Sequence, residues 1–166
     1  MNDSPVVVAY IGLGSNLDNP IEQIRNAQQK IAALPGIDET GFSSLYRSPP
    51  MGPQDQPDYV NAVMSIATKC SAIDLLHALQ TIEQLHGRIR RGERWGARTL
   101  DLDVLLYGDR EIDLPDLTVP HVGIAERAFV LYPLYELAPA LTIPGKGTLA
   151  DLVANCPKGG LQRISE

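Results

Sequence analysis

Near the middle of the chain the sequence reads Arg94-Trp95-Gly96-Ala97-Arg98-Thr99-Leu100-Asp101-Leu102-Asp103-Val104-Leu105-Leu106-Tyr107. The second half of this stretch predicts a β-strand, because it is short, rich in Leu and Val, and followed by the turn pair Gly108-Asp109. Side chains alternate between the two faces of a strand, so we expect Asp101 and Asp103 on the same face. The opposite face, directed to the core, is expected to carry Leu100, Leu102, Val104 and Leu106.

The two carboxylates are candidates for a metal site. Held about 7 Å apart along a strand they repel each other, and a divalent cation such as Mg²⁺, which prefers oxygen ligands, removes the repulsion. A strand with an acidic outer face and no ligand is the alternative interpretation. The preceding segment carries five arginines within eleven residues, namely Arg88, Arg90, Arg91, Arg94 and Arg98. Cations beside paired carboxylates, with Trp95 among them, favour a clamp for a polyphosphate–metal complex.

Length, charge and cysteines restrict the function classes. The 166 residues predict a single domain over 1–166, large enough to bury a core. The net charge of −6 argues against a general nucleic-acid binder, which carries a basic face. Cys70 and Cys156 lie far apart without zinc-ligand spacing, which fits a reducing compartment. Because the sequence shows no signal-peptide pattern and no long apolar run, we expect a cytoplasmic protein without a membrane or nucleic-acid partner.

The N-terminal strand, expected over 6–13, leads into Gly12-Leu13-Gly14-Ser15-Asn16. A dinucleotide-binding fingerprint requires a third glycine at position 17, which is Leu17. The sequence contains no Walker-type phosphate loop. The Gly14-Ser15 pair lies too far before Asp101 for the close arrangement found in nucleotidyltransferases. These glycines therefore predict none of the common nucleotide-binding motifs.

A first amphipathic helix follows the N-terminal strand. Asn19 is its expected N-cap, with Pro20 in the first turn and Glu22 completing a capping box. Pro35-Gly36 is expected to end it. The predicted apolar stripe consists of Ile21, Ile24, Ala27, Ile31 and Leu34.

A second helix is predicted from the capping-box pattern Ser71-Ala72-Ile73-Asp74 to Gly87. Its inward-facing residues are expected to be Leu75, Leu76, Leu79 and Ile82. Gln80 and Glu83 share a face one turn before the arginine-rich segment. Taken alone, this pair predicts a solvated helix surface.

Residues 58–68 alternate and predict a strand whose core face carries Val60, Ala62, Met64 and Ile66. The opposite face brings together Tyr59 and Asn61, an aromatic ring beside an amide. Such a pair holds a flat heteroaromatic ligand by stacking and edge hydrogen bonds, although ordinary sheet surface is the alternative. Residues 37–47 are expected to form an irregular strand, and 48–58, with four prolines, a stiff loop.

The C-terminal third predicts shorter elements. Residues 108–121 are expected to form a hairpin followed by a short strand. A helix is predicted over 125–137, interrupted at Pro133, with Phe129 in the core. A short last helix is predicted over 148–155.

The order of elements predicts the α+β class. A strand-helix-strand-strand-helix-strand order is typical of the ferredoxin-like βαββαβ plan, an antiparallel sheet with helices on one face, here with a C-terminal extension. This plan leaves the other sheet face open for a ligand. The polar residues expected on that face are Tyr59, Asn61, Asp101 and Asp103. The plan alone does not determine function.

Five segments of the sequence match the motifs of a known family in the same order. They are Gly14-Ser15-Asn16-Leu17, Tyr46-Arg47-Ser48-Pro49-Pro50, residues 52–61, residues 94–103, and Leu117-Thr118-Val119-Pro120-His121. Together they resemble the 6-hydroxymethyl-7,8-dihydropterin pyrophosphokinase family. The resemblance covers nearly the whole chain, and the run over residues 94–103 is specific.

The resemblance implies transfer of an intact pyrophosphoryl group from ATP to the hydroxymethyl oxygen of 6-hydroxymethyl-7,8-dihydropterin, with release of AMP, in folate biosynthesis. It implies two Mg²⁺ ions on Asp101 and Asp103, which would act in catalysis with Arg88 and Arg98. The implied pterin-binding residues are Ser48, Pro49, Pro50, Met51, Tyr59, Asn61, Trp95 and Phe129. The implied ATP-binding residues are Gln80, Glu83, Arg88, Arg90, Trp95, Arg98, Thr118, His121 and Arg127.

Two positions depart from the family pattern. Val122 replaces a common aromatic residue and bears on a phosphate or ribose contact, whereas Ala97 replaces a common proline and bears on the stiffness of its loop. A magnesium nucleotidyltransferase, which would release pyrophosphate, is the alternative enzyme class. A non-catalytic RNA-binding module is a further alternative, but it predicts aromatic motifs and a basic sheet face, which the sequence lacks. Without a heptad pattern, we expect a monomer.

Overall fold

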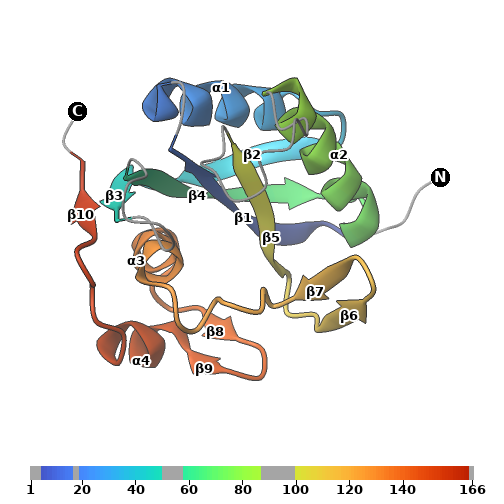
Figure 1. Cartoon of the computed structure of the whole chain (residues 1–166). Helices are drawn as coiled ribbons and strands as arrows, with labels where there is room; N and C mark the ends of the chain where they lie inside the picture. The colour runs from blue at the N-terminus through green and yellow to red at the C-terminus, as the bar shows by residue number, and fades with distance from the viewer. Residues whose placement is uncertain (1–4, 17–18, 50–57, 87–99, 165–166) are drawn as a thin grey trace.

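The structure is a computed structural model that describes residues 5–16, 19–49, 58–86 and 100–164. Figure 1 shows a central antiparallel sheet with helices on both sides. The strands of this sheet are β1 (Val7–Ser15), β2 (Ile37–Phe42), β3 (Tyr46–Ser48), β4 (Tyr59–Thr68), β5 (Asp101–Tyr107) and β10 (Gln162–Arg163). The helices are α1 (Pro20–Ala32), α2 (Ala72–Leu85), α3 (Ala128–Leu137) and α4 (Leu149–Ala154). Two small hairpins pair β6 (Ile112–Leu114) with β7 (Leu117–Val119) and β8 (Thr142–Ile143) with β9 (Gly147–Thr148).

The sheet has the strand order β10-β3-β4-β1-β5, and β2 also pairs with β4. The expected irregular strand over 37–47 is therefore two strands that follow one another along the same edge of β4. A register shift between Glu39 and Gly41 interrupts the first of them. The α+β class with an antiparallel sheet is confirmed.

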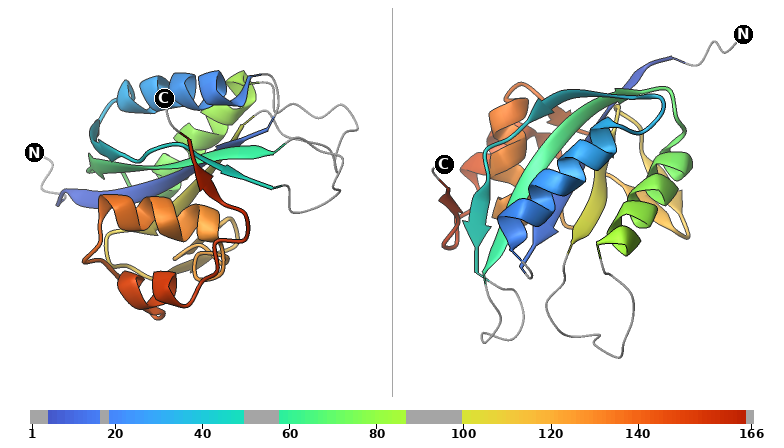
Figure 2. Two further views of the ribbon diagram at one scale, coloured as in Figure 1. Left: turned by 90° about the vertical axis from the view of Figure 1, so that its left-hand side faces the viewer. Right: turned by 90° about the horizontal axis from the view of Figure 1, so that it is seen from above.

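Helices cover both faces of the sheet, which corrects the prediction of helices on one face only. Figure 2 shows α1 and α2 on one side of the sheet and α3 and α4 on the other. The physical reason is that β4 is buried on both of its faces, from Val60 through Ile66. One core lies between the sheet and helices α1 and α2. The Val63 side chain points to the opposite face of the sheet, where it packs in a second core with Leu131 and Leu134 of α3. The open face is therefore limited to the part of the sheet that α3 leaves uncovered.

The two N-terminal helices begin where the sequence predicts, but only one N-cap forms. Ser71 Oγ accepts a hydrogen bond from the Asp74 N–H at 3.1 Å, a contact that contributes about 1 kcal/mol. Asn19 makes no side-chain capping bond, because it adopts a left-handed backbone with φ 66°. Pro20 lies in the first turn of α1, and α1 ends at Ala32, so Leu34 packs beyond the helix.

A β-bulge changes the face of one residue in β5. Tyr10 pairs with Leu106 while Ile11 pairs with Val104, so Leu105 is the extra residue. Leu102 and Val104 lie in the core beneath α1 and α2, as predicted. The prediction for Leu106 was wrong, because the bulge turns it into the second core.

Helix α3 continues through Pro133, so the predicted interruption was wrong. A carboxylate at the end of α3 joins this helix to β3. Glu136 accepts hydrogen bonds from Tyr46 OH at 2.7 Å and from the Ser44 N–H at 3.0 Å. Burial, and then the Glu136 contact, raise the pKa of the Tyr46 hydroxyl. Within the described ranges, none of the helices has the length and apolar character that crossing a membrane requires.

Candidate active site

Two glycines of the central strand β1 form the floor of the candidate site. Gly14 lies opposite Asn61 of β4 on one side and Asp101 of β5 on the other. Gly12 lies opposite Asp103. Directly paired residues project from the same face of a sheet, so Asn61, Asp101 and Asp103 share one face with no β1 side chain between them. By alternation Tyr59 also belongs to this face.

The amide of Asn61 is held by one hydrogen bond and lies in space that Gly14 leaves free. Its Nδ2 donates to Ser48 Oγ at 2.7 Å, and both residues are buried. A Cβ on Gly14 would lie 3.2 Å from Asn61 Oδ1, closer than an ordinary van der Waals contact. The missing side chain of Gly14 thus leaves room for the Asn61 amide. The sequence analysis did not predict that Gly14 forms the floor of the site. The spacing of two between Gly12 and Gly14 in a strand could have indicated this role, because it places both glycines on one face.

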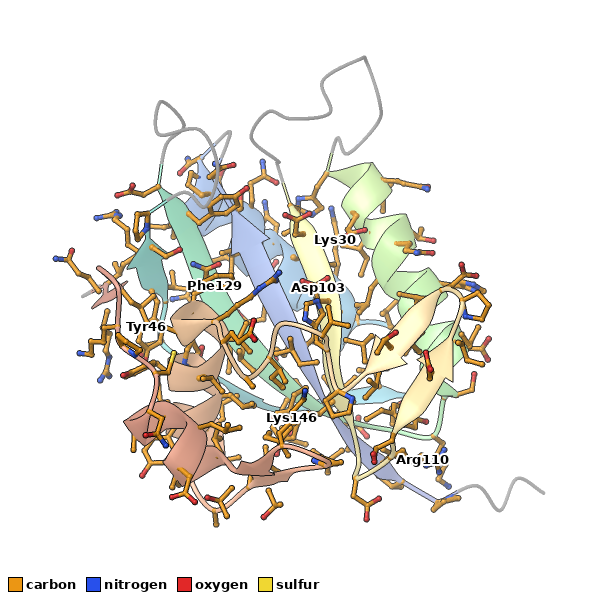
Figure 3. The ribbon with its side chains drawn as sticks, turned by 60° about the horizontal axis from the view of Figure 1, so that its bottom comes forward. Lys30, Tyr46, Asp103, Arg110, Phe129 and Lys146 are labelled. Carbon is orange, nitrogen blue, oxygen red and sulfur yellow. The ribbon has the colours of Figure 1, made fainter. Side chains whose placement is uncertain are left out.

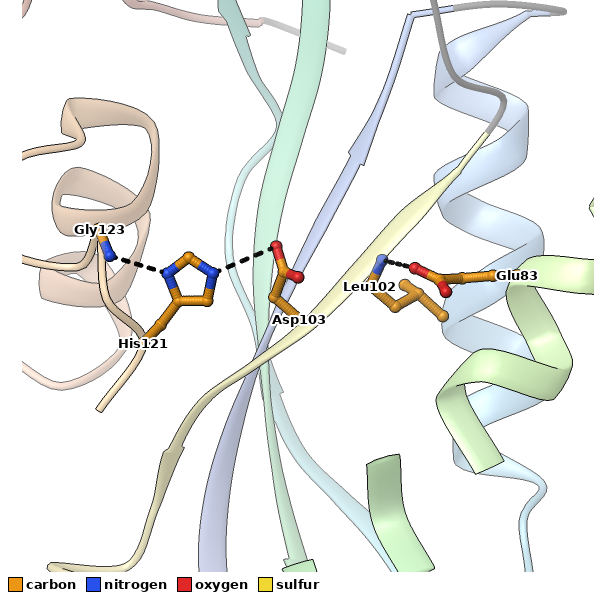
Figure 4. Close-up of polar contacts among 5 residues, drawn as sticks. All are labelled: Glu83, Leu102, Asp103, His121 and Gly123. Carbon is orange, nitrogen blue, oxygen red and sulfur yellow. Dashed lines mark hydrogen bonds and ion pairs between the residues drawn. The ribbon is translucent and has the colours of Figure 1, made fainter. Parts of the chain in front are cut away.

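A histidine faces the acidic strand from the loop after β7. His121 Nε2 lies 4.0 Å from Asp103 Oδ2, and the Asp103 side chain is half exposed (Figure 4). His121 Nδ1 accepts a hydrogen bond from the Gly123 N–H at 3.1 Å. Because Nδ1 is an acceptor, the proton of a neutral ring is on Nε2, directed to Asp103. His121 is also held through its backbone, whose N–H donates to the Leu105 carbonyl at 3.0 Å.

The carboxylate of Glu83 supports β5 from the side of α2. Glu83 of α2 is buried, and its Oε2 accepts a hydrogen bond from the Leu102 N–H at 2.7 Å (Figure 4). The predicted solvated surface was wrong for Glu83, because α2 packs its last turns against β5. Gln80, three residues earlier, is exposed as predicted.

Helix α3 contributes an aromatic ring and a cation. Figure 3 shows Phe129 on α3 and Asp103 on β5, on the same side of the sheet. Phe129 is partly buried and packs against the second core, so the core prediction holds for part of its surface. The Arg127 guanidinium carbon lies 5.8 Å from the centroid of the Phe129 ring, within the range of a cation–π contact.

Comparison with known proteins identifies the family. A family model described as 7,8-dihydro-6-hydroxymethylpterin-pyrophosphokinase (HPPK) matches residues 10–139. The chain belongs to this family. A 2-amino-4-hydroxy-6-hydroxymethyldihydropteridine pyrophosphokinase of Pseudomonas aeruginosa is 50% identical over 155 residues, covering 93% of this chain and 95% of the relative. A protein of the same name from Haemophilus influenzae is 49% identical over 148 residues, covering 89% of this chain and 92% of the relative.

A solved structure supports the fold. The crystal structure of wild-type Plasmodium falciparum HPPK-DHPS with pteroate matches with a TM-score of 0.73 at 13% identity. The match covers 93% of this chain but 43% of that chain, so the present chain spans under half of the Plasmodium protein. At this identity the likeness shows the shared fold alone.

The remaining residues that the family resemblance implies are spread around this centre. Asp101 and Tyr59 are partly buried, and Thr118 of β7 is exposed. The ring of Pro49 lies against Gly160, where a Cβ would meet it at 3.4 Å. Six of the predicted residues lie outside the described ranges: Pro50, Met51, Arg88, Arg90, Trp95 and Arg98.

The chemistry of the carboxylate pair fits a magnesium ion. In the described parts of the chain, no three His, Cys, Asp or Glu side chains gather into a protein-only metal cage. Mg²⁺ does not need one, because it is commonly bound by one or two carboxylates together with substrate phosphates and waters. Asp101 and Asp103 project from one face of a paired strand, and Asp103 is half exposed, so both oxygen donors suit this ion.

Proposed function

We propose that this chain transfers the pyrophosphoryl group of ATP to the hydroxymethyl oxygen of 6-hydroxymethyl-7,8-dihydropterin, releasing AMP, as a step of folate biosynthesis. The observation that carries the proposal is the shared face of Asn61, Asp101 and Asp103 across the glycine floor, in a chain of the HPPK family. Relatives about half identical to the chain bear the pyrophosphokinase name. A relative from Schizosaccharomyces pombe, 43% identical over 159 residues that cover 95% of this chain but 22% of the relative, is named "Folic acid synthesis protein fol1".

The reaction places demands mainly on alignment. The hydroxymethyl oxygen attacks the β-phosphorus of ATP, the bond between that phosphorus and the α–β bridging oxygen breaks, and AMP leaves with that oxygen. The attacking hydroxyl loses its proton to a base. Transfers of this type gain from positioning and charge neutralisation more than from covalent chemistry by the protein. We propose that the paired strands of the sheet supply that positioning.

Asp101 and Asp103 are the proposed ligands of two Mg²⁺ ions. When bound, these ions would neutralise the triphosphate and the charge that develops on it. The role of the chain is to hold both carboxylates at a fixed spacing. The register of β5 against β1 and the hydrogen bond from Leu102 to Glu83 both support such rigidity.

Tyr59, Phe129 and Asn61 are the proposed pterin grip. Both rings are partly buried, as expected for aromatic side chains that keep one face for a ligand. Asn61 would hydrogen-bond the polar edge of the pterin, since Ser48 holds its amide in place. The backbone of Ser48, Pro49, Pro50 and Met51 and the side chain of Trp95 complete the proposed pocket.

Cations and polar groups are proposed to bind the phosphates. His121 and Arg127 lie on the α3 side of β5, where the N-terminus of α3 adds the positive end of its dipole. The other proposed contacts to ATP are those of Gln80, Glu83, Arg88, Arg90, Trp95, Arg98 and Thr118. Arg88 and Arg98 are proposed to act in catalysis by neutralising charge at the transferred group.

The finer fold assignment and the setting belong to the same proposal. The order β5-β1-β4 with β2 and β3 along the next position supports a ferredoxin-like βαββαβ plan, extended by α3 and the segments after it. We propose that residues 1–166 form a single domain, that the protein is a monomer, and that it acts in the cytoplasm.

A product assay tests the function. The protein is incubated with ATP, MgCl₂ and 6-hydroxymethyl-7,8-dihydropterin, and the nucleotide products are separated by chromatography. The proposal predicts AMP and pterin diphosphate in equal amounts, with no AMP when the pterin is omitted. Formation of ADP, or release of inorganic pyrophosphate as by a nucleotidyltransferase, would overturn it.

A further inference from the structure

Gly123, which follows His121 by two positions, makes two separate contacts beside the candidate site. The first uses its backbone N–H, which donates to His121 Nδ1 at 3.1 Å. This contact excludes a proton on Nδ1 and places the ring N–H on Nε2, 4.0 Å from Asp103 Oδ2. Any residue other than proline could supply this backbone donor, so the first contact does not by itself require glycine.

The second contact depends on the missing side chain. A Cβ on Gly123 would lie 2.4 Å from Nε and 2.8 Å from Cζ of Arg127, too close for the guanidinium to stay where it is. The backbone at Gly123 is not in the left-handed region, in contrast to Gly108 or Gly145. The bare Cα of Gly123 therefore bears on where the flexible Arg127 side chain places its guanidinium, rather than on the backbone conformation.

The start of helix α3 does not stabilise the charge of Arg127. Arg127 is the N-cap residue of α3 and makes no side-chain capping bond. A cation at a helix N-terminus faces the positive end of the helix dipole, which disfavours it by about 0.3–1 kcal/mol. An anion bound nearby would remove this conflict. The guanidinium is thus held over Phe129 in a place that suits a phosphate ligand.

We infer that Gly123 is a positioning residue for the triphosphate of the nucleotide. Its N–H fixes His121 with Nε2–H facing Asp103, and its bare Cα lets the Arg127 guanidinium lie over Phe129. The inference rests on the proposed function for the identity of the ligand, but the geometry concerns this chain alone.

The decisive variant is Gly123→Ala, because it keeps the backbone N–H and adds only the Cβ. The inference predicts that the KM for ATP rises by about tenfold or more, as for the loss of a hydrogen bond to a charged group, while kcat changes much less. Arg127→Ala should raise the KM similarly. In the double variant the two effects should not multiply, because Gly123 acts through Arg127. Ala140→Gly, a one-carbon change at an exposed position, serves as the control.

Two outcomes contradict the inference. One is an unchanged KM for ATP in Gly123→Ala, and the other is a full multiplication of the two effects in the double variant. If wild-type protein forms no AMP, the proposed function fails instead. The cycle is then read from calorimetric affinities for a non-hydrolysable ATP analogue, and it tests Gly123 separately.

A measurement on the wild-type protein needs no variant to fold. Long-range ¹H–¹⁵N spectra distinguish the two neutral tautomers of a histidine ring. For His121 the inference predicts the Nε2–H tautomer in the ligand-free protein at a pH where the ring is neutral. A ring protonated on Nδ1 would contradict the contact with Gly123.

Discussion

The carboxylate of Glu83 accepts the backbone N–H of Leu102 at 2.7 Å, and Leu102 is the residue between the two acidic side chains of β5. A charged acceptor on a buried N–H is one of the stronger hydrogen bonds in a protein. The contact joins α2 to the outer edge of β5, because the inner edge pairs with β1. Glu83 therefore holds the strand from which Asp101 and Asp103 project.

Replacing Glu83 separates this support from a role of its charge. Glu83→Ala leaves the Leu102 N–H without its acceptor, so we expect a loss of about 1–3 kcal/mol in the free energy of unfolding. Glu83→Gln keeps an acceptor oxygen and should lose less. Urea unfolding of both variants measures the difference, and Gln80→Ala on the exposed side of α2 is the control. Equal losses in the Ala and Gln variants would contradict the assignment.

The hydrogen bond between Ser48 and Asn61 makes a prediction about pterin affinity. Ser48→Ala removes the acceptor of the buried Asn61 Nδ2, at 2.7 Å, and frees the amide to turn away from the sheet face. An unsatisfied buried donor costs about 1–3 kcal/mol, and we expect about a tenfold weaker pterin affinity. Calorimetric titration with the pterin measures it. Ser43→Ala, a buried serine that bonds Val63 instead, should affect stability but not affinity.

The common face of the acidic residues was predictable because it depends on local geometry alone. Side chains alternate along a strand, and Leu102 fixes which face is buried. That Leu106 points to the face opposite to Leu102 was not predictable, because the bulge at Leu105 arises only from the pairing of β5 with β1. The period of a strand can be read from its own sequence, whereas a register shift is a property of two strands.

The local sequence also does not show which faces of a helix or strand are buried by distant elements, or which glycines leave room for a neighbouring side chain. Glu83 has the spacing of an exposed helix residue and is buried only because β5 lies against the end of α2. The cover that α3 gives to Val63 depends on the path of the chain after β7. Gly123 carries no motif beyond its distance of two from His121, and its need for space depends on the conformation of Arg127. Each of these features joins elements distant in sequence.

The carboxylate pair makes the sharpest prediction about metal dependence. Asp101→Asn and Asp103→Asn keep the size of the side chains and remove the charges that would bind Mg²⁺. We expect AMP formation to fall by on the order of a thousandfold in each, with pterin affinity nearly unchanged. Excess EDTA should abolish turnover of the wild-type protein, and added MgCl₂ should restore it. Asp109→Asn, in the exposed turn after β5, is the matched control.

His86, the C-cap residue that follows α2, makes a prediction about pH and stability. Lys30 Nζ can only donate, so at 3.2 Å His86 Nε2 accepts from it, and Nδ1 then donates to Gln23 Oε1. The contact with Lys30 requires the neutral ring, because a protonated Nε2 could no longer accept, whereas the bond to Gln23 is compatible with either state. Burial, and next the charge of Lys30, lower the pKa of His86 below its ordinary value of 6.5. The folded protein therefore binds this proton less readily than the unfolded chain.

The direction of the pH dependence of stability follows from this difference in pKa. A group whose pKa is lowered by folding contributes stability above its unfolded pKa, and that contribution is lost as the pH falls through 6.5 toward the folded value. We therefore expect His86→Gln to flatten the decline of unfolding free energy below pH 6.5, measured by urea titrations at several pH values. His77→Gln, on the exposed face of the same helix, removes a histidine without touching the buried contacts. A decline equally steep in wild type and His86→Gln would show that other groups cause it.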